Sequence, residues 1–450
     1  MSLPAGSGGS EFFFGSLSCH AHPLVQAMLK WLLLLLLIGR TVVAEAAGSF
    51  VEPVEAAMHG NPRTLAAEAR LRAAREKRNQ SRALLHPSIE AGVSRTHTDL
   101  TWPEYHTSTD PLVLGVTLRQ SLYSQKAWIA LRQSKPYIAA SEAELRAAMQ
   151  GVFLDTVVAI AELLQAREVA RLAGNNRELI ARHLEETRAR FKVGQLTVTD
   201  VSRAEARLSA AEANVVRSES TLAVARARFL EMTGVEEPEG LTLPEVRSGL
   251  LALPLEGMLE RGGARPDLEA ARLRLRVAEE DVAMKRAGHL PSVALTAKAS
   301  RGWGEEITGS RDPVGHYEVG VGVTVPVYSG GMTVAETDEA LALRDAQQAE
   351  VELLRRRMAR EVESALRDLR GLEAADRSLR GALSAAEVAM RGVEEEFRVG
   401  TRTALELLDA RNEEFTARIE LARNHFALSS ARFRLLAAMG ELTLEALRDP

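Results

Sequence analysis

Apolar residues recur every three or four positions along much of the chain, which is the spacing of one face of a helix. The longest such stretches run from Met332 to Arg398 and from Gln125 to Lys192. In the first of them the apolar seam consists of Val351, Leu354, Met358, Val362, Ala365, Leu369, Leu372, Ala375, Leu379, Leu383, Ala386, Met390, Val393 and Phe397. Such a seam predicts a helix about 100 Å long that packs against another helix. Pro136 and Gly174-Asn175-Asn176 interrupt the other stretch, and we expect a kink or irregular packing there.

A shorter helix is predicted after each long one. Val193-Gly194 and Val399-Gly400 mark tight turns at the ends of the two long stretches. After the first turn the seam consists of Val201, Ala204, Leu208, Ala211, Val215, Ser218, Leu222, Ala225, Phe229 and Met232. After the second turn it consists of Phe415, Ile419, Ala422, Phe426, Ser429, Phe433 and Leu436. The chain is therefore expected to form two long helical hairpins, whose small seam residues let the helices approach closely.

Two pairs of segments alternate between apolar and polar residues instead. In the first pair the apolar positions are Ile89, Ala91 and Val93, then Leu112, Leu114, Val116 and Leu118. In the second pair they are Val293, Leu295 and Ala297, then Tyr317, Val319, Val321, Val323 and Val325. Mostly polar residues or glycine lie between them, so each segment predicts a strand with one apolar face. The connections Thr98 to Asp110 and Gly304 to Pro313 are expected to be loops.

A half-buried hairpin in a soluble sandwich would show the same alternation. Four strands, however, can neither close a barrel nor cover a soluble sheet by themselves. Each is roughly ten residues long, which is what a tilted strand needs to cross a bilayer. Aromatic residues gather at the strand ends and loops, as they do at membrane interfaces: Trp102, Tyr105, Tyr123, Trp303, Tyr317 and Tyr328. We therefore expect a barrel closed by strands from several chains.

The order of elements occurs twice. A helical stretch from about Leu65 to Leu85 precedes the first strand pair, and one from about Asp267 to Arg286 precedes the second. Short motifs recur about 205 residues apart, as a duplicated unit requires. They include Asn61-Pro62 with Arg265-Pro266, and Phe191-Lys192-Val193-Gly194 with Phe397-Arg398-Val399-Gly400.

The repeat sets the expected domain boundaries. The two copies are residues 47–233 and 265–440, and a connector at 234–264 joins them. Prolines punctuate that connector at Pro238, Pro244 and Pro254. Residues 441–450 are expected to be a short tail.

The N-terminal region resembles a secretory signal peptide. The apolar run Leu32 to Ile38 follows Lys30 and precedes Ala44-Glu45-Ala46, a pattern that signal peptidase accepts. We expect residues 1–46 to be this segment, with Met28 as an alternative start and residues 1–27 upstream of it. The run is too short for a membrane-spanning helix, and we expect no later stretch to be apolar enough for one. An exported membrane protein of this kind must span the bilayer as a barrel.

Composition supports helices and gives no indication of catalysis. Aromatic residues make up 4% of the 450 residues, and the net charge of −5 disfavours a nucleic-acid partner. The motifs GxSxG, HExxH and GxxxxGK[ST] are absent from the sequence. Gly320-Val321-Gly322 is a lone GxG within an alternating strand. We therefore expect no enzyme activity, no cofactor and no metal site.

The tip of the second hairpin carries a family resemblance. The segment Phe397-Arg398-Val399-Gly400-Thr401-Arg402-Thr403, followed by Glu406 and Leu407-Leu408-Asp409-Ala410, resembles the TolC-type outer-membrane efflux family. Its counterpart in the first copy is Arg190-Phe191-Lys192-Val193-Gly194 with Thr199-Asp200-Val201. The duplicated order of helix, strand pair, long helix, turn and helix extends the resemblance over essentially the whole chain after the signal segment.

The resemblance implies a mainly α fold with a transmembrane β part. Three protomers would each give four strands to one 12-stranded β-barrel, and their helices would continue it as an α-helical barrel into the periplasm. The implied function is a passive exit duct of a tripartite efflux or type I secretion system in the cell outer membrane. Its partners would be two further copies, a periplasmic adaptor, an inner-membrane pump and outer-membrane lipid. The substrate, whether drug, metal or secreted protein, would depend on that pump.

A periplasmic coiled-coil adaptor or scaffold is the alternative from another class, since it would also be exported and helical. An adaptor normally carries one helical hairpin flanked by halves of small β-domains. Two hairpins in tandem, each preceded by two strands of barrel length, argue against it.

The resemblance also implies roles for residues at the hairpin ends. Glu406 and Asp409 correspond to a ring of carboxylates at a narrow mouth, which would attract cations and repel anions. Arg402 would act as a latch to Thr199 and Asp200 of the neighbouring hairpin. Adaptor docking is expected at Val193, Gly194, Val399 and Gly400. The competing interpretation is a set of solvated surface charges, each pair worth about 0.3–0.5 kcal/mol. Phe397 stands where better-known members have a tyrosine, so closure is expected to be weaker or differently held.

Overall fold

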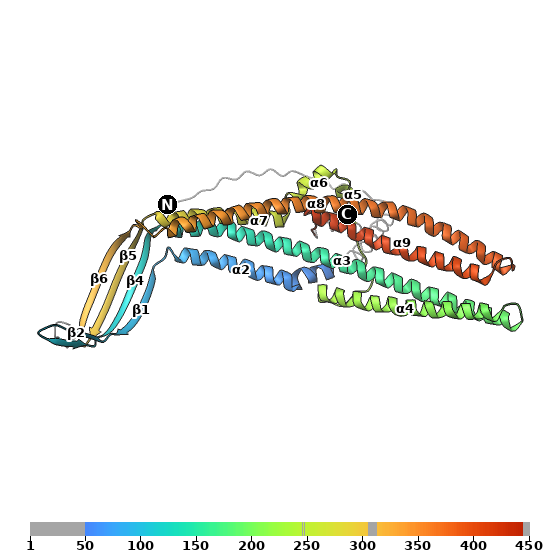
Figure 1. Ribbon diagram of the computed structural model, residues 1–450, viewed down its shortest axis with the longest axis horizontal. Coiled ribbons are helices and arrows are strands. Elements are labelled where there is room, and N and C mark those ends of the chain that lie inside the picture. The colour runs from blue at the N-terminus through green and yellow to red at the C-terminus, as the bar shows by residue number, and fades with distance from the viewer. Residues whose placement is uncertain (1–49, 245, 247, 305–312, 444–450) are drawn as a thin grey trace, which may run out of the picture.

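The protein is an elongated bundle of helices with a β-sheet at one end (Figure 1). A computed structural model describes residues 50–244, 246, 248–304 and 313–443. The expected signal segment, most of the loop Gly304 to Pro313 and most of the tail 441–450 lie outside these residues. Within them the helices run along the long axis, and the strands leave the bundle at the end opposite the hairpin turns (Figure 1).

Four helices form the two hairpins. They are α3 (Gln125–Lys192) with α4 (Val198–Thr233), and α8 (Met332–Arg398) with α9 (Ala404–Met439). The predicted bounds of both long helices are confirmed. Helix α3 continues through Pro136 and Gly174, so neither residue ends it.

The predicted seams of α8 and α4 are confirmed, because every position in them is buried or half-buried. In α4 the buried small residues recur every seven positions, at Ala204, Ala211, Ser218 and Ala225. Such spacing allows α4 to lie close against α3.

The seam predicted for α9 is confirmed by the same criterion, because each of its positions is buried or half-buried. Phe415 and Ile419 are half-buried and line a groove with α3 and α4. The positions that meet α8 include polar residues: Asn424 donates from Nδ2 to the Leu372 carbonyl at 3.2 Å, and Arg411 pairs with Glu394 at 3.2 Å. The apolar pattern does not reveal these two polar residues, which are satisfied by partners on the other helix.

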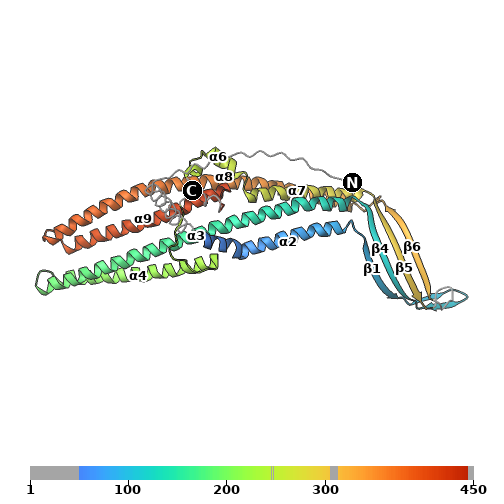
Figure 2. The same ribbon diagram turned by 180° about the vertical axis from the view of Figure 1, so that it is seen from behind.

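Each shorter helix of a hairpin is prolonged by another helix (Figure 2). Helix α2 (Pro62–Ala83) follows the line of α4 along α3, and α7 (Pro266–Arg286) follows the line of α9 along α8. Both begin slightly earlier than predicted, with a proline in the first turn, a position where its missing N–H costs nothing.

One side chain bridges each junction between two helices in line, α4 with α2 and α9 with α7. In the first copy Asn61 caps α2 and donates from Nδ2 to the Met232 carbonyl in the last turn of α4 at 3.3 Å. In the second copy Arg265 reaches the Ala438 carbonyl in the last turn of α9 at 3.4 Å. The two contacts occupy corresponding places in the repeat, so each copy ties the start of one helix to the end of the other.

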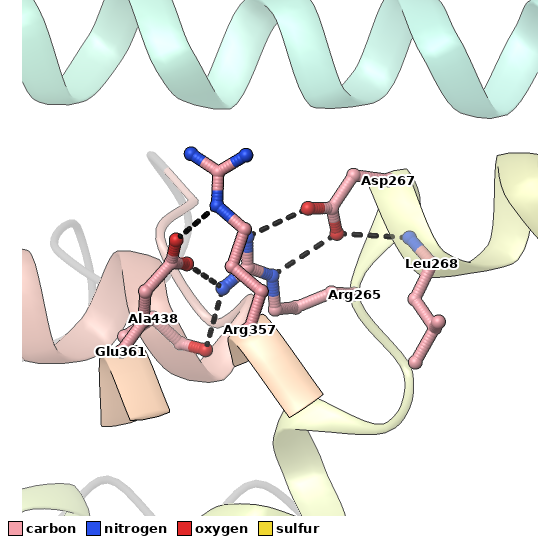
Figure 3. Close-up of polar contacts among 6 residues, drawn as sticks. All are labelled: Arg265, Asp267, Leu268, Arg357, Glu361 and Ala438. Atoms are coloured by element: carbon pink, nitrogen blue, oxygen red, sulfur yellow. Dashed lines mark hydrogen bonds and ion pairs between the residues drawn. The ribbon is translucent and has the colours of Figure 1, made fainter. Parts of the chain in front are cut away.

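The Arg265 junction carries additional ion pairs (Figure 3). Arg265 binds Asp267 through Nε at 3.0 Å and Nη2 at 2.6 Å, and it binds Glu361 of α8 through Nη1 at 2.7 Å. Arg357 holds the other oxygen of Glu361 at 2.9 Å. Only 16% of the Arg265 side chain is exposed, and these bonds raise its pKa against the opposing effect of burial.

The connector covers the core where the two hairpins meet. It contains α5 (Ser248–Leu251) and α6 (Leu255–Gly262). Met258 is fully buried, and Gly262 lies so close to Met358 that an added Cβ would stand 2.6 Å from its Sδ. The main core gathers residues of α3, α4, α8, α9 and this connector.

Helix α3 contradicts one expectation. By length and composition it could cross a membrane, although no stretch after the signal segment was expected to do so. Half of its apolar window is buried, and Val157, Ile160 and Leu163 belong to the central core. Its apolar character therefore reflects a helix surrounded by other helices rather than by lipid.

Four strands form the main sheet in the order β1-β4-β5-β6, with every neighbouring pair antiparallel. Their bounds are β1 (Ser88–Arg95), β4 (Leu112–Ser124), β5 (Ser292–Trp303) and β6 (Val314–Thr324). The predicted loop from Thr98 to Asp110 is instead a small hairpin, β2 (Thr98–Thr101) with β3 (His106–Thr109). Its threonines favour strands, and Trp102 stacks on Tyr105 at its turn.

The register places the predicted apolar residues on one face. Val116 lies between Ala91 of β1 and Ala299 of β5, and Ala297 pairs with Val319 of β6. This face is exposed, and Tyr317 reaches 83% exposure. The outer strands β1 and β6 each have one edge without a partner strand among the described residues. The sheet therefore exposes an apolar face and two strand edges that a soluble protein would cover.

Candidate functional site

The exposed ends of the two helical hairpins hold the residues singled out in the sequence. Gly194 and Gly400 adopt left-handed backbone angles, with φ of +78° and +84°. Their amides bond to the carbonyls of Phe191 at 2.9 Å and Phe397 at 3.1 Å. Glycine takes this conformation without a steric penalty, which allows the chain to reverse within a few residues. Val193 and Val399 project beside these turns, 70% and 75% exposed.

A capping box starts the returning helix of each hairpin. Asp200 accepts from the Thr197 amide at 2.9 Å, and Glu406 accepts from the Thr403 amide at 2.8 Å. Each threonine hydroxyl in turn accepts from the amide of its acidic partner at 3.3 Å. Asp200 and Glu406 are therefore corresponding residues, and both are engaged locally in satisfying the free amides of a helix start.

The second hairpin adds an arginine to its capping box. Arg402 donates from Nε to Glu396 and from Nη1 to Glu406, each at 2.7 Å. The first copy has Leu196 at the corresponding place. Within one chain the structure thus pairs Arg402 with its own hairpin and does not bring it to Thr199 or Asp200.

Asp409 faces the other hairpin. Its Oδ1 accepts from Nη2 of Arg207 at 2.7 Å, which joins α9 to α4. Sequence reasoning did not single out Arg207, because a lone arginine on a helix has no distinctive pattern. The pair is about half exposed, so it is worth at most about 1 kcal/mol.

Phe397 forms the apolar contact between the hairpins near their ends. It is 7% exposed and packs with Ala404 and Leu407 of its own hairpin. From α3, the His183 ring approaches to 5.9 Å between centroids, and the Arg190 guanidinium lies 4.7 Å over the Phe397 ring. The ring thus binds the first hairpin without a hydroxyl, through packing and a cation–π contact. His183 was not predicted either, since a single buried histidine leaves no signature in a sequence.

The acidic residues of the capping boxes are held in their charged form. Hydrogen bonds from the Thr403 amide, Arg402 and the Thr403 hydroxyl lower the pKa of Glu406 to about 2. In the first copy, hydrogen bonds from the amide and hydroxyl of Thr197 lower the pKa of Asp200. Among the described residues no group of three or more His, Cys, Asp or Glu could hold a metal ion.

Titration of Glu406 tests this description. We expect a midpoint near 2 in the intact protein, followed by the carbon-13 resonance of its carboxyl group. Since a lowered pKa favours the folded tip, the stabilisation is present above about pH 4.3 and is lost as the pH falls toward 2. Arg402→Gln and Thr403→Ala should each move the midpoint upward, whereas Thr403→Ser, which keeps the hydroxyl, should move it little. A midpoint that is the same in the parent and all three variants would contradict the hydrogen bonds from Arg402 and the Thr403 hydroxyl to Glu406.

Comparison with known proteins agrees with this architecture. A family model described as outer membrane efflux protein matches residues 54–235 and 263–441. The outer membrane protein TolC of Vibrio cholerae is 26% identical over 420 residues, which cover 92% of this chain and 95% of that protein. The proteases secretion protein PrtF of Dickeya chrysanthemi is 27% identical over 341 residues, covering 74% and 73%. The solved structure of the outer-membrane channel OprN matches with a TM-score of 0.76 at 25% identity, covering 88% of this chain and 90% of that one.

The fold is therefore that of an outer-membrane channel, in which strand hairpins are joined to long helical hairpins. The chain belongs to the outer membrane efflux protein family. Its function is that of an outer-membrane channel for efflux or secretion, and it is located in the outer membrane. The family consists of channel proteins and not of enzymes.

Proposed function

We propose that three copies of this chain assemble into one exit duct. The observation that carries the proposal is the sheet, which has an exposed apolar face and two strand edges without partners among the described residues. Because four antiparallel strands alternate in direction, β6 of one copy next to β1 of the following copy continues the antiparallel order. Twelve strands from three copies would then close a barrel with its apolar face toward lipid.

The helices would continue this barrel as a tube. The stacked pairs α2 with α4 and α7 with α9 lie alongside α3 and α8, so each protomer supplies a curved wall of helices (Figure 2). In this proposal the duct itself is passive. A periplasmic adaptor and an inner-membrane pump supply energy and determine whether the substrate is a drug, a metal or a secreted protein.

We further propose that the wall consists of two copies of one unit, residues 47–233 and 265–440, joined by the connector 234–264. Matching helix lengths support this division. Helices α3 and α8 have 68 and 67 residues, and α4 and α9 have 36 each. A repeat of this kind gives two similar hairpins with different tips. Arg402, which bonds to Glu396 and Glu406, is present only at the tip of the second hairpin.

The hairpin ends are the proposed mouth and docking region. Val193, Gly194, Val399 and Gly400 are exposed and available to an adaptor. Glu406 and Asp409, gathered by threefold symmetry, would form a ring of carboxylates that favours cations. Arg402 would leave Glu396 to bind Thr199 and Asp200 of a neighbouring protomer when the mouth is closed.

Purified full-length protein tests the duct. We expect a trimer in the outer-membrane fraction that resists heating in detergent, and step-like conductance in planar bilayers. Recovery as a soluble periplasmic protein without detergent would overturn the proposal and favour the adaptor or scaffold alternative.

The latch has its own test in the same bilayers. Combining Arg402→Ser with Asp200→Ala should raise single-channel conductance several-fold, because the mouth loses the bond that holds it narrow. Arg398→Ser removes a neighbouring exposed pair with Glu395 and should leave conductance unchanged. If the double variant conducts like the parent, these residues are solvated surface charges and not a latch.

A further inference from the structure

A buried histidine lies where the two helical hairpins meet near their ends. His183 on α3 is 3% exposed and packs against Phe397 of α8. Its Nε2 has no hydrogen-bond partner among the described residues. A buried nitrogen without a partner is tolerated in a neutral ring, but a protonated ring would leave a charged donor unsatisfied.

The charged groups around His183 also favour the neutral form of its ring. From its own helix Arg190 and Glu186 approach, and they pair with each other at 2.6 Å. From α9 comes Arg411, whose partner is Glu394 of α8 at 3.2 Å. Helix α4 brings charged residues to the same region, and each has a partner elsewhere: Glu205 with Arg188, Arg207 with Asp409 and Glu212 with Arg177. The carboxylate that would favour a histidine charge, Glu186, is thus already occupied by an arginine.

The titration of the ring follows from these surroundings. Burial lowers the pKa of His183, the Arg411 charge lowers it further, and the effects of Glu186 and Arg190 oppose each other. A histidine with a lowered pKa stabilises the packed arrangement fully above its ordinary value of about 6.5. That contribution is lost as the pH falls below this value.

We propose that His183 makes the contact between the two hairpins sensitive to acid. At neutral pH the uncharged ring fills the interface beside Phe397. On acidification an added proton places a third cation next to Arg190 and Arg411, and the interface separates so that water can solvate it. A consequence for passage through the mouth rests on the proposed function, whereas the separation of the hairpins does not.

Distance measurements between the tips of the two hairpins test this acid-sensitive contact in the full-length, detergent-solubilised protein. Gln195 and Val399, both exposed, are replaced by cysteine and spin-labelled, one on each hairpin. We expect a narrow distance distribution at pH 7.5 and a longer, broader one at pH 5.5. In His183→Gln, which keeps a polar side chain but cannot be charged, the distribution should be the same at both pH values.

A matched control separates this effect from a general response to acid. His425→Gln alters an exposed histidine on α9 that contacts Phe426, and it should retain the full response to pH. The inference is overturned if the parent shows no change, or if His183→Gln changes as the parent does. Should His183→Gln fail to fold, nitrogen-15 titration of His183 in the parent decides, and a midpoint at or above 6.5 overturns the inference. Conductance is measured in parallel to distinguish the two proposals. Hairpins that separate in a protein without any channel activity would refute the proposed duct but not the acid-sensitive contact at His183.

Discussion

Replacing Val116 by arginine is expected to abolish assembly in the outer membrane. Val116 lies near the middle of β4 on the apolar face, with Ala91 and Ala299 on either side. An arginine facing lipid near the midplane costs about 2–4 kcal/mol, and in the proposed trimer each of the three copies would bear that cost. The neighbouring alanines offer no carboxylate to offset it. We expect Val116→Arg to yield little or no heat-resistant trimer in membrane fractions.

The next residue provides the matched control. Thr117 belongs to the opposite face of the same strand, where it pairs with Glu90 of β1 and Lys298 of β5. Thr117→Arg therefore introduces the same side chain on a polar face and next to a carboxylate. It should assemble nearly as well as the parent and change only the conductance. If both variants assemble equally, the apolar face does not meet lipid and the proposed barrel is wrong.

Replacing Arg265 by methionine is expected to cause a large loss of stability in the helical part. The substitution keeps the apolar stem but removes the bonds to Asp267, Glu361 and the Ala438 carbonyl (Figure 3). Two carboxylates that are less than half exposed would then lose a shared cation. Breaking fully buried pairs costs about 3–5 kcal/mol, and residual solvation together with Arg357 reduces this to about 2–3 kcal/mol. The midpoint of urea unfolding, followed by circular dichroism, should fall accordingly.

Two comparisons define the size of this effect. Arg367→Met removes an exposed pair with Glu363 on the same helix and should change the free energy of unfolding by less than about 0.5 kcal/mol. Asn61→Ala removes the corresponding junction of the first copy, which rests on neutral hydrogen bonds, and should cost about 1 kcal/mol. An Arg265→Met protein as stable as Arg367→Met would show that the junction does not hold the stacked helices together.

The elements with strong local signals were predicted well. Both long helices begin and end as expected, because a strand precedes each of them and a Val-Gly turn follows. The alternating segments are strands for the same reason: the period of two is visible within each segment. The hairpin β2 with β3 was missed because Leu100 is the one apolar residue in its two strands, which is too few to show an apolar alternation.

The sequence singled out candidate residues at the hairpin ends but did not reveal their contacts across the two hairpins. The turns and the acidic residues carry a motif, whereas the partners of Asp409 and Phe397 come from α4 and α3, some 200 positions away in the chain. For α9 the apolar pattern located buried positions, but it did not reveal the polar members of the interface with α8, Asn424 and Arg411. Such polar members are stable only because the opposite helix supplies a matching group.

The sequence by itself determined the two hairpins, the four strands and their turns, since each is encoded by periodicity or by residues close together in the chain. Only the tertiary structure decided which strands are neighbours. It also decided that Arg265 and Asn61 form hydrogen bonds to the last turns of α9 and α4, and that His183 is buried beside Phe397. These features depend on pairings between distant segments, and the free energy of such a pairing arises from geometry that no local pattern records.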